Sequence, residues 1–537
     1  MKSRCSRRGL RLAASTIAAR IKPIAETIQY DGHLMKAKSL LLVTVDCLRA
    51  DHVGFLGYSC ATTPFLDSLA KESLVFSAAI AGGSPTYYSL PAILASRSAL
   101  ALGRDLLGIA PGEETLASAL HNAGYATAAF TAANPYISRR TGYDTGFDEF
   151  RDFLNADTAG ANDERHAQEA SRVNRGLDRL SHALGPLGSL YDELYFEYCQ
   201  RIATPAPDSL DTLRRFPAAN VLVDTALAWL SGQGDRPFFL WLHFMDPHAP
   251  YYPTSKAIEL LGMPQVSPFR ARYINSYWNR SDLGAGRLQR HRQEVIDLYD
   301  AGIRWVDENL ARLAAALRQR GTWEDCLMAV TADHGEEFLE RGGRFHPPTF
   351  LSEERIRVPL LIRAPRRSGV VSNSAFSLLD LAPTLLDALG ASAPREFRGT
   401  SRWPRLLSHE NWDDPAVAEC ISGCTNPFDA EKRLASRLLA VRGRRYKLVV
   451  DFDRGEDNLF DLEADPRELR ALPQEEQRPA RRRLLDVAYS HVTGMIRDRD
   501  HDMALRLRLR ELPLQWAASD AARFHDVPAA ARQNGGH

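Results

Sequence analysis

Residues 39–46 read Ser-Leu-Leu-Leu-Val-Thr-Val-Asp, a continuous apolar run that ends in an aspartate. Such a run, without the alternation of a half-exposed strand, is typical of a parallel strand that is buried on both faces. Two further runs have the same design. Residues 238–244 (FFLWLHF) lead into residues 245–248 (MDPH), and residues 326–331 (CLMAVT) lead into residues 332–335 (ADHG). The sequence therefore predicts at least three buried strands that each end in polar side chains.

Helical periodicity separates these strands, most clearly over residues 295–320, and residues 358–362 (VPLLI) predict a fourth strand. Strands that alternate with helices predict an α/β fold, in which a large central sheet carries helices on both faces. Ligands of such sheets bind beyond the carboxyl ends of the strands. The polar side chains at those ends are Asp46, His248, Asp333 and His334. We therefore expect the functional site at this edge of the sheet.

The chain divides into segments of different composition. Residues 1–38 are basic and nearly free of acidic side chains, and residues 39–394 form the expected α/β domain. Within that domain, residues 151–215 are polar and helix-prone. We interpret them as a helical insertion near the site that sets substrate choice, with a solvated surface excursion as the alternative.

A smaller unit follows the α/β domain. Short strand patterns at residues 438–441, 446–450 and 458–462 predict an antiparallel subdomain over residues 395–490. Residues 491–537 are then expected to form an Arg-rich helix and a tail.

Composition limits the classes of partner. The 67 basic and 67 acidic side chains cancel, whereas nucleic-acid binding demands a basic balance, so we expect no nucleic-acid partner. No run of about 18 apolar residues occurs, so no membrane span is predicted. Residues 6–12 faintly resemble a twin-arginine export signal, but the apolar stretch after them is short and interrupted. We expect a cytoplasmic protein, with export as the alternative.

Asp46, Asp333 and His334 together suit a divalent cation. Carboxylates combined with an imidazole form a hard-to-borderline ligand set that accepts Mg, Mn, Ca or Zn. A single aspartate at a strand end is commonly a helix cap or an ion-pair partner. Two strand ends, one of which carries Asp-His-Gly, favour a metal site.

Residues 82–91 (GGSPTYYSLP) lead from a glycine-rich stretch into a helix start, with Ser89 as the expected N-cap and Pro91 in the first turn. Amide groups at a helix start bind anions. A hydroxyl that is placed there and coordinated to a metal is a competent nucleophile toward phosphorus or sulfur. Taken alone, Thr86 would be a polar turn residue.

These motifs, in this order and spacing, resemble the sulfatase family and its relatives in the alkaline phosphatase superfamily along residues 39–472. The matching stretches are residues 45–52 (VDCLRADH), 62–70 (TTPFLDSLA), 246–251 (DPHAPY), 331–336 (TADHGE), 379–385 (LDLAPTL) and 459–466 (LFDLEADP). The resemblance implies a sulfatase-like (alkaline phosphatase-like) domain, a divalent metal (Mn, Zn, Mg or Ca), and a small-molecule sulfate or phosphate ester as substrate.

The departures from the family bear on the chemistry. Sulfatases carry a Cys or Ser that is oxidised to formylglycine, followed by x-Pro-Ser-Arg. The alignment places Thr86 at this nucleophile position, with Tyr88 in place of Pro and Leu90 in place of Arg. Oxidation of a threonine would give a ketone rather than an aldehyde, so a formylglycine mechanism is disfavoured.

The resemblance also assigns roles around the nucleophile. The family's Lys-x-His segment is replaced by residues 131–135 (TAANP), and Asn134 resembles the oxyanion-binding Asn of Thr-nucleophile relatives. Those relatives include phosphodiesterases, phosphonate monoester hydrolases and phosphoethanolamine transferases. His248 is the expected general acid toward the leaving group. His243 lies within a strand and is expected to be a core histidine.

Two positions leave alternatives open. His346 follows the second metal motif much as a histidine does in the two-metal relatives. It could ligate a second ion, bind a substrate oxygen, or be an ordinary loop histidine. Cys47 replaces the second Asp of the family's Asp-Asp pair and is expected to be a bystander, which leaves Asp46, Thr86, Asp333 and His334 around one ion.

We therefore expect a metal-dependent hydrolase with a Thr nucleophile that favours phosphodiester or phosphonate monoester substrates. The alternatives are a sulfuric ester hydrolase of the arylsulfatase type without formylglycine, a phosphoryl-group transferase, and a non-catalytic binding protein on the same scaffold. The sequence does not set the oligomeric state.

Overall fold

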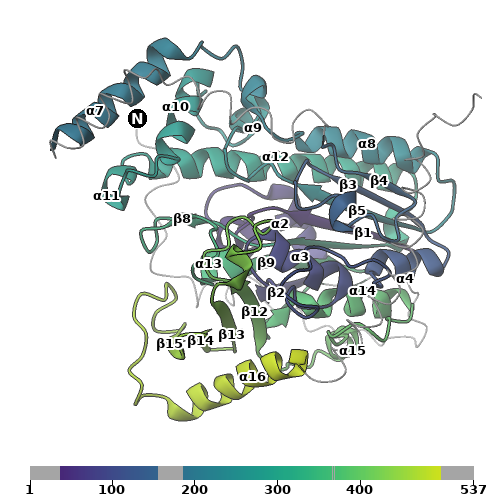
Figure 1. Ribbon diagram of the computed structural model, residues 1–537. Coiled ribbons are helices and arrows are strands. Elements are labelled where there is room, and N and C mark those ends of the chain that lie inside the picture. Colours follow the sequence, from purple (N-terminus) through teal and green to yellow (C-terminus); the bar gives the residue numbers. More distant parts are fainter. Residues whose placement is uncertain (1–36, 155–185, 366, 368, 497–537) are drawn as a thin grey trace, which may run out of the picture.

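The computed structural model describes residues 37–154 and 186–496, except positions 366 and 368 (Figure 1). The twin-arginine-like stretch, the middle of the expected insertion at residues 151–215 and most of the Arg-rich tail lie outside the described residues.

A mixed sheet forms the centre of the fold, and all four strands expected from the sequence belong to it. Its strand order is β10-β2-β9-β6-β1-β5-β3-β4, and β11 also pairs with β2. The bounds are β1 Ser39–Val45, β2 Leu74–Ile80, β3 Ala126–Thr131, β4 Glu149–Arg151, β5 Phe238–Phe244, β6 Cys326–Ala332, β9 Arg357–Arg363, β10 Val370–Ser372 and β11 Phe376–Ser377.

The three strands with polar ends lie side by side in the middle of this sheet. Strand β1 runs parallel to both β5 and β6, and Val45 is level with Phe244 on one side and Ala332 on the other. The residues that follow these strands therefore leave the sheet at the same height. Strand β9, the fourth expected strand, runs antiparallel to β6, a direction that a buried apolar run does not reveal.

Helices cover both faces of the sheet, as expected (Figure 1). The long helix α12 (Arg292–Gln319) packs with α8 (Ala219–Ser231) on one face, and α3 (Thr86–Ala95), α4 (Leu116–Asn122) and α14 (Leu381–Leu389) pack together on the other. The other α-helices within the described part of the main unit are α2 Pro64–Leu69, α7 Pro186–Tyr198, α9 Ser255–Leu260, α10 Pro268–Trp278, α11 Ala285–Leu288, α13 Glu353–Ile356 and α15 Trp403–Leu407.

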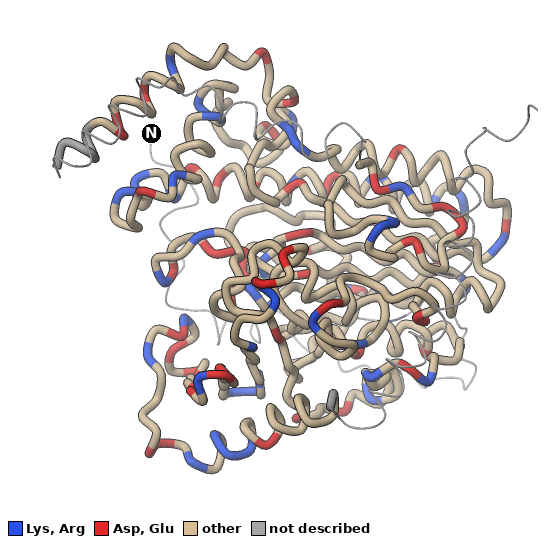
Figure 2. Tube along the Cα trace, in the orientation of Figure 1, with Lys and Arg blue, Asp and Glu red and all other residues tan. Residues whose placement is uncertain are grey.

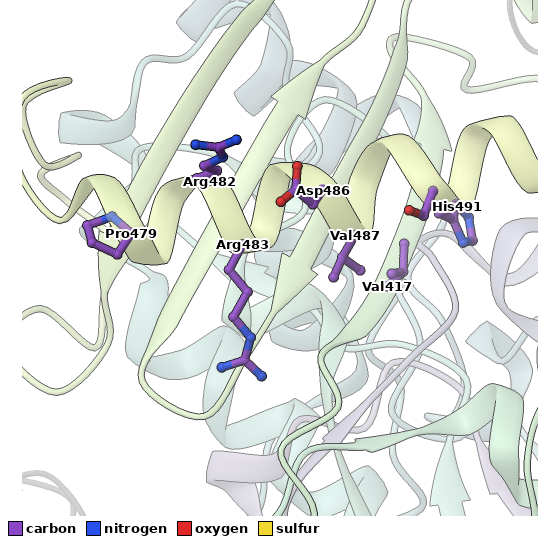
Figure 3. A pocket seen from close by; sticks show the side chains of 8 residues that line it. Val417, Pro479, Arg482, Arg483, Asp486, Val487 and His491 are labelled. Carbon is purple, nitrogen blue, oxygen red and sulfur yellow. The ribbon is translucent and has the colours of Figure 1, made fainter.

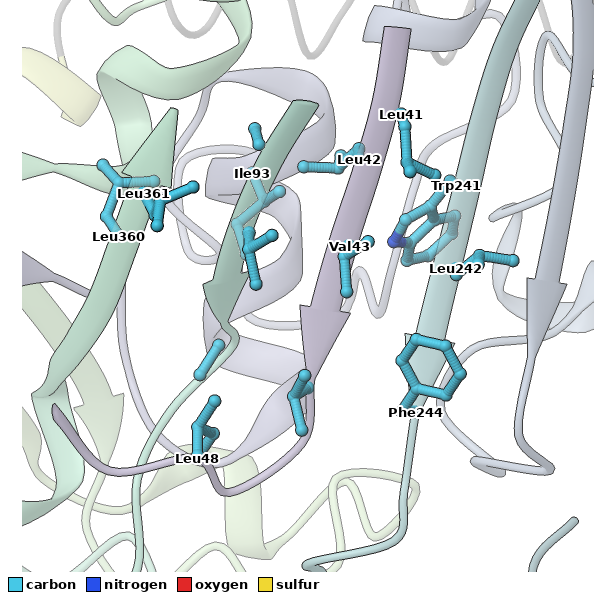
Figure 4. Close-up of a cluster of buried hydrophobic side chains, with 14 of the residues drawn as sticks. Leu41, Leu42, Val43, Leu48, Ile93, Trp241, Leu242, Phe244, Leu360 and Leu361 are labelled. Atoms are coloured by element: carbon cyan, nitrogen blue, oxygen red, sulfur yellow. The ribbon is translucent and has the colours of Figure 1, made fainter. Parts of the chain in front are cut away.

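Strand β1 is buried along its whole length because both faces of the sheet are covered. Its leucines belong to one buried apolar cluster that also contains Leu242 of β5, Ile93 of α3 and, beyond β6, Leu361 of β9 (Figure 4). Burial of each such side chain contributes about 1.5–3 kcal/mol. Thr44 is the one polar residue in the interior of the strand, so its hydroxyl must find partners inside the core.

A second, four-stranded antiparallel sheet follows, with the order β12-β13-β14-β15. The strands are β12 Ala416–Ile421, β13 Arg437–Arg442, β14 Tyr446–Asp451 and β15 Glu456–Asp461, and β12 is a strand that the sequence did not predict. Leu484 and Ala488 of helix α16 (Arg478–Ile496) pack on one face of the sheet. The other face packs against the main unit near Tyr87 and Tyr88.

Charged side chains follow the same layering. Lys, Arg, Asp and Glu are interspersed around the periphery, whereas the central strands are almost free of them (Figure 2). Among the described residues, no helix combines the length and the apolar character needed to cross a bilayer.

Glu419 of β12 joins the two sheets close to helix α3. Its backbone forms a parallel bridge with Gly83, and a Cβ on that glycine would lie 2.3 Å from Glu419 O, so only glycine allows the approach. The buried carboxylate accepts a hydrogen bond from Leu100 N (2.9 Å) and pairs with Arg437 and His491. Burial alone would raise the pKa of Glu419, but Arg437 and then His491 outweigh burial and lower it to about 2.

Glu419→Gln should destabilise the protein at neutral pH by on the order of 3 kcal/mol, because it removes a buried charge from its cationic partners. A carboxyl whose pKa is lower in the folded state stabilises fully above its unfolded pKa, and this contribution is lost as the pH falls toward the folded pKa. The difference in unfolding free energy between wild type and variant, measured by urea unfolding, should be roughly 1 kcal/mol smaller at pH 3.5 than at pH 7. An equal gap at both pH values would contradict this account.

Candidate active site

The expected site residues meet at the carboxyl edge of the central sheet. Asp46 follows β1, and Asp333 and His334 follow β6. Asn134 follows β3 and His248 follows β5, and these four strands are neighbours in the order β6-β1-β5-β3. The structure therefore brings together side chains that are far apart in the sequence.

Thr86 is the first residue of helix α3 and is almost fully buried. Its Oγ1 lies 3.2 Å from His334 Nε2 and 3.4 Å from Asp46 Oδ2. The sequence-based prediction of Ser89 as the N-cap is wrong, because the helix begins directly after Pro85. Ser89 instead lies inside the helix, where its hydroxyl donates to the carbonyl oxygen of Asp333. The earlier start places Thr86 at the first turn, against the strand ends.

Asp46 is the centre of the hydrogen-bond network. Its Oδ2 accepts hydrogen bonds from Asn134 Nδ2 (2.8 Å) and from His243 Nε2 (3.3 Å). Burial alone would raise the pKa of Asp46, but the surrounding imidazoles outweigh burial, that of His248 above all, and hold the pKa well below its usual range. Asp46 is therefore an anion in the folded protein.

A chain of hydrogen bonds fixes the orientation of His243. Trp241 Nε1 can only donate, and it donates to Thr44 Oγ1 (2.9 Å). The Thr44 hydroxyl lies 2.8 Å from His243 Nδ1, so it can donate its own proton there. The imidazole then carries its proton on Nε2, which faces Asp46 Oδ2. His243 is buried in the core, as expected, but it also holds a site carboxylate in place, a role that the sequence did not indicate.

Asp333 and His334 present atoms that suit a cation. Asp333 Oδ2 is buried without a hydrogen-bond partner among the described residues, and burial followed by repulsion from Asp46 raises the pKa of Asp333. His334 Nδ1 lies 2.9 Å from Gly335 O and so carries the ring proton, which leaves the lone pair on Nε2. That Nε2 lies 3.6 Å from both Asp46 Oδ1 and Asp333 Oδ2. These donors fit a divalent metal ion.

A second group of polar side chains lies beside these residues. Cys47 Sγ is 3.1 Å from Asp46 Oδ1 and 3.4 Å from His346 Nδ1, and Glu336 Oε1 lies 3.2 Å from the same nitrogen. The ring of His248 lies 5.1 Å from that of His346. Burial, together with the negative charge of Glu336, raises the pKa of Cys47 well above its usual value. Burial lowers the pKa of His346.

Helix α12 fixes the loop that carries Asp46 and Cys47. The Tyr299 hydroxyl donates to Cys47 O (2.8 Å) and accepts from Arg49 N (3.0 Å). Cys47 has a φ of 61°, in the left-handed region that non-glycine residues rarely adopt. Glu336 and Tyr299 were not singled out as site residues from the sequence, although Glu336 lies within residues 331–336, one of the stretches that resemble the sulfatase family.

A concave region elsewhere on the chain is separate from this site. It lies along helix α16 and strand β12, and the site residues do not line it (Figure 3). Its lining is formed by Val417, Pro479, Arg482, Arg483, Asp486, Val487, Ser490 and His491.

Comparison with protein-family models identifies the class. A model described as Sulfatase matches residues 38–391, and one described as N-sulphoglucosamine sulphohydrolase, C-terminal, matches residues 343–487. The first match covers well over half of the chain. The protein therefore belongs to the sulfatase family, whose members are metal-dependent hydrolases that act on sulfate esters.

Individual relatives are distant. The multifunctional alkaline phosphatase superfamily protein PehA of Trinickia caryophylli is 24% identical, over 81% of this chain and 91% of that protein. An arylsulfatase of Clostridium perfringens is 24% identical, over 82% of this chain and 91% of that protein. Arylsulfatase K of Xenopus laevis is 26% identical over 46% of this chain, and the match spans about half (51%) of that relative.

A solved structure shares the fold. The phosphonate monoester hydrolase SpPMH from Silicibacter pomeroyi superposes with a TM-score of 0.60 at 20% identity, over 86% of this chain and 96% of that chain. This likeness confirms the expected fold.

Asp333→Asn should show that the Asp333 carboxylate destabilises the metal-free protein but is needed for metal binding. Removal of a buried charge that repels Asp46 should raise the unfolding free energy of the metal-free protein by on the order of 1 kcal/mol. We expect Mn²⁺ or Zn²⁺ to raise the melting temperature of the wild type, since an ion that binds only the folded state stabilises it, and we expect Asp333→Asn to abolish this rise. Thermal unfolding with and without a chelator measures both effects.

The matched control is Asp325→Asn. Asp325 lies at the opposite end of strand β6 and pairs with the exposed Lys38, so its loss should change stability by less than about 1 kcal/mol and leave the metal response intact. An unchanged metal response in Asp333→Asn would remove Asp333 from the ligand set.

Proposed function

We propose that this protein is a metal-dependent hydrolase that uses Thr86 as its nucleophile and prefers phosphodiester or phosphonate monoester substrates. The observation that carries the proposal is the position of the Thr86 hydroxyl, 3.2 Å from His334 Nε2 and 3.4 Å from Asp46 Oδ2. A hydroxyl among metal-type donors at a helix start is placed to attack an ester anion.

Asp46, Asp333, His334 and Thr86 would hold one divalent ion, of Mn, Zn, Mg or Ca. A bound ion would supply the positive charge that lowers the pKa of the Thr86 hydroxyl and offsets charge on the ester oxygens. His346 would ligate a second ion or bind a substrate oxygen. Asn134 would donate to an ester oxygen by exchanging its 3.4 Å contact with Met245 Sδ, which is the weaker of its two Nδ2 contacts.

Thr86 Oγ would attack the phosphorus or sulfur in line, and the bond to the leaving oxygen would break as the bond to threonine forms. The Thr86 hydroxyl proton would pass to solvent, and His248, with both ring nitrogens protonated, would give its Nε2 proton to the leaving oxygen. His248 would recover that proton from the water that attacks in the second step. Its Nδ1 contacts the carbonyl oxygen of Ala249, so Nε2 is the nitrogen available to the substrate. Water would then cleave the phospho- or sulfo-threonine ester and restore the hydroxyl.

Two features support phosphorus over sulfur as the reacting centre. Thr86, Tyr88 and Leu90 replace the residues that formylglycine formation needs in sulfatases. No lysine occurs between Lys71 and Lys256, so the lysine that binds sulfate in the family is missing from this half of the site. The fold shared with a phosphonate monoester hydrolase and the relation to PehA are consistent with this preference.

Sulfate ester hydrolysis without formylglycine is the second candidate. The arylsulfatase of Clostridium perfringens, which aligns over 91% of its length, favours it. Metal binding without turnover of any ester would instead favour a binding protein, and turnover that requires an acceptor alcohol would favour a phosphoryl-group transferase.

Thr86→Ala should reduce turnover by at least about a thousandfold, because it removes the nucleophile, whereas Thr86→Ser should keep part of the activity. The measurement is turnover of four aryl esters (sulfate, phosphate monoester, phosphodiester and phosphonate monoester) by chelator-treated protein reloaded in turn with Mg, Ca, Mn and Zn. We expect phosphodiester or phosphonate cleavage to be fastest. Unimpaired turnover by Thr86→Ala would show that Thr86 is not the nucleophile. A modified mass for the peptide that contains Thr86 would show that the nucleophile is not an unmodified threonine hydroxyl.

His248→Asn should lower kcat/KM most for esters with poor leaving groups, by about 10²–10⁴-fold, since a general acid contributes most where the leaving oxygen is most basic. Nitrophenyl esters, which need little protonation, should lose much less. A series of substituted phenyl esters compared between wild type and variant measures the difference in slope. A uniform loss across the series would assign His248 to binding rather than to proton transfer.

A further inference from the structure

Cys47 stands where sulfatases carry the second aspartate of an Asp-Asp pair, and the sequence suggested that it is a bystander. The structure surrounds its sulfur with polar atoms instead. Cys47 Sγ is fully buried, 3.1 Å from Asp46 Oδ1 and 3.4 Å from His346 Nδ1. A thiol without a role would be expected to pack against apolar side chains, as Cys326 does at the other end of the sheet.

The sulfur is shared by two groups of side chains that could hold an ion. One group is Cys47, His334 and His346, and the other is Asp46, Cys47 and His248, with ligand atoms within 4.8 Å of one another in each group. A third group, which contains Asp46, His243 and Asp333, lies beside them. Cys47 is therefore not an isolated cysteine but the member that links two clusters of donors.

The spacing of the donors matches a coordination sphere. Around a tetrahedral ion with a metal–sulfur distance of about 2.3 Å and a metal–nitrogen distance of about 2.0 Å, the two ligand atoms lie about 3.5 Å apart. The 3.4 Å between Cys47 Sγ and His346 Nδ1 is close to this value. The buried Asp333 Oδ2, which lacks a hydrogen-bond partner among the described residues, independently indicates that the adjoining third group, which shares Asp46 with the Cys47 groups, is suited to a cation.

We propose that Cys47 is a thiolate ligand of a divalent ion, with His346 as the neighbouring ligand, and that it directs the site toward thiophilic ions such as Zn²⁺ rather than Ca²⁺ or Mg²⁺. This inference deepens the proposed function by naming the class of ion. Only the statement that this ion takes part in hydrolysis rests on the proposed function. Binding of the ion by Cys47 does not.

The protons balance simply. Binding breaks the S–H bond of Cys47, forms one metal–sulfur bond and releases one proton to solvent. Before binding, the His346 proton that can reach Glu336 Oε1, 3.2 Å away, is the one on Nδ1. Binding therefore also requires the neutral ring to move its single proton to Nε2, which presents the Nδ1 lone pair to the ion. Glu336, which lies 3.2 Å from Nδ1, then stands beside the ion as a further anion.

The test is titration of chelator-treated protein with Co²⁺, which gives a near-ultraviolet charge-transfer band only when a thiolate is bound to it. We expect the band in the wild type and its loss in Cys47→Ser. The Zn²⁺ affinity of the variant should fall at least about tenfold, the loss that even outer-shell partners cause. Cys47→Asp, which restores a hard oxygen ligand, should bind Co²⁺ without the band and shift the preference toward Ca²⁺ or Mg²⁺.

Cys326→Ala is the matched control, because Cys326 is equally buried on strand β6 but lies at the far end of the sheet, and it should keep the band. Co²⁺ bound to the wild type without the band, a band that survives in Cys47→Ser, or no Co²⁺ binding at all would overturn the proposal. The presence or absence of the band in the wild type tests thiolate ligation even if a variant misfolds. A full band without ester turnover would count against the hydrolase proposal and leave this one standing.

Discussion

Two buried carboxylates, Asp46 and Asp333, point toward the same space from the ends of adjacent strands, and the surrounding structure responds to their repulsion. No lysine or arginine side chain pairs with either of them among the described residues. Imidazoles and an amide offset part of the unfavourable burial and repulsion of the two carboxylates instead. The offset is incomplete, since Asp333 Oδ2 has no hydrogen-bond partner within the described part of the chain. Two buried carboxylates that lack full hydrogen bonding form a site at which binding of a cation is favourable.

The surrounding core makes this arrangement rigid. Each polar group that holds Asp46 is itself held from a different element, with Thr44 on β1 and His243 on β5 joined by the register of the two strands. Tyr299 on helix α12 fixes the loop that follows β1. Because the tautomer of His243 is set by donors deep in the sheet, the orientation of the site carboxylate is decided by buried packing rather than by solvent.

Much of this could be predicted from the sequence, because the decisive signals are local. Apolar runs that end in Asp46 and Asp333 identify the strands, and the motif order identifies the family. The direction of β9, the existence of β12 and the start of helix α3 at Thr86 depend on tertiary packing, which no short window contains. The role of His243 depends on strand register, and the contacts of Cys47 depend on where the loop with His346 folds back.

The junction between Glu419 and helix α3 bears on how the protein is made. Leu100 and Glu419 are 319 positions apart, so at about 5–20 residues per second a ribosome needs between about 15 and 60 s to deliver the second partner after the first. During that interval Ile80, Tyr87 and Tyr88 have no sheet to pack against. The nascent chain therefore exposes these apolar side chains beside Thr86 until the last quarter of the polypeptide has been synthesised, and exposed apolar surface of this kind favours aggregation.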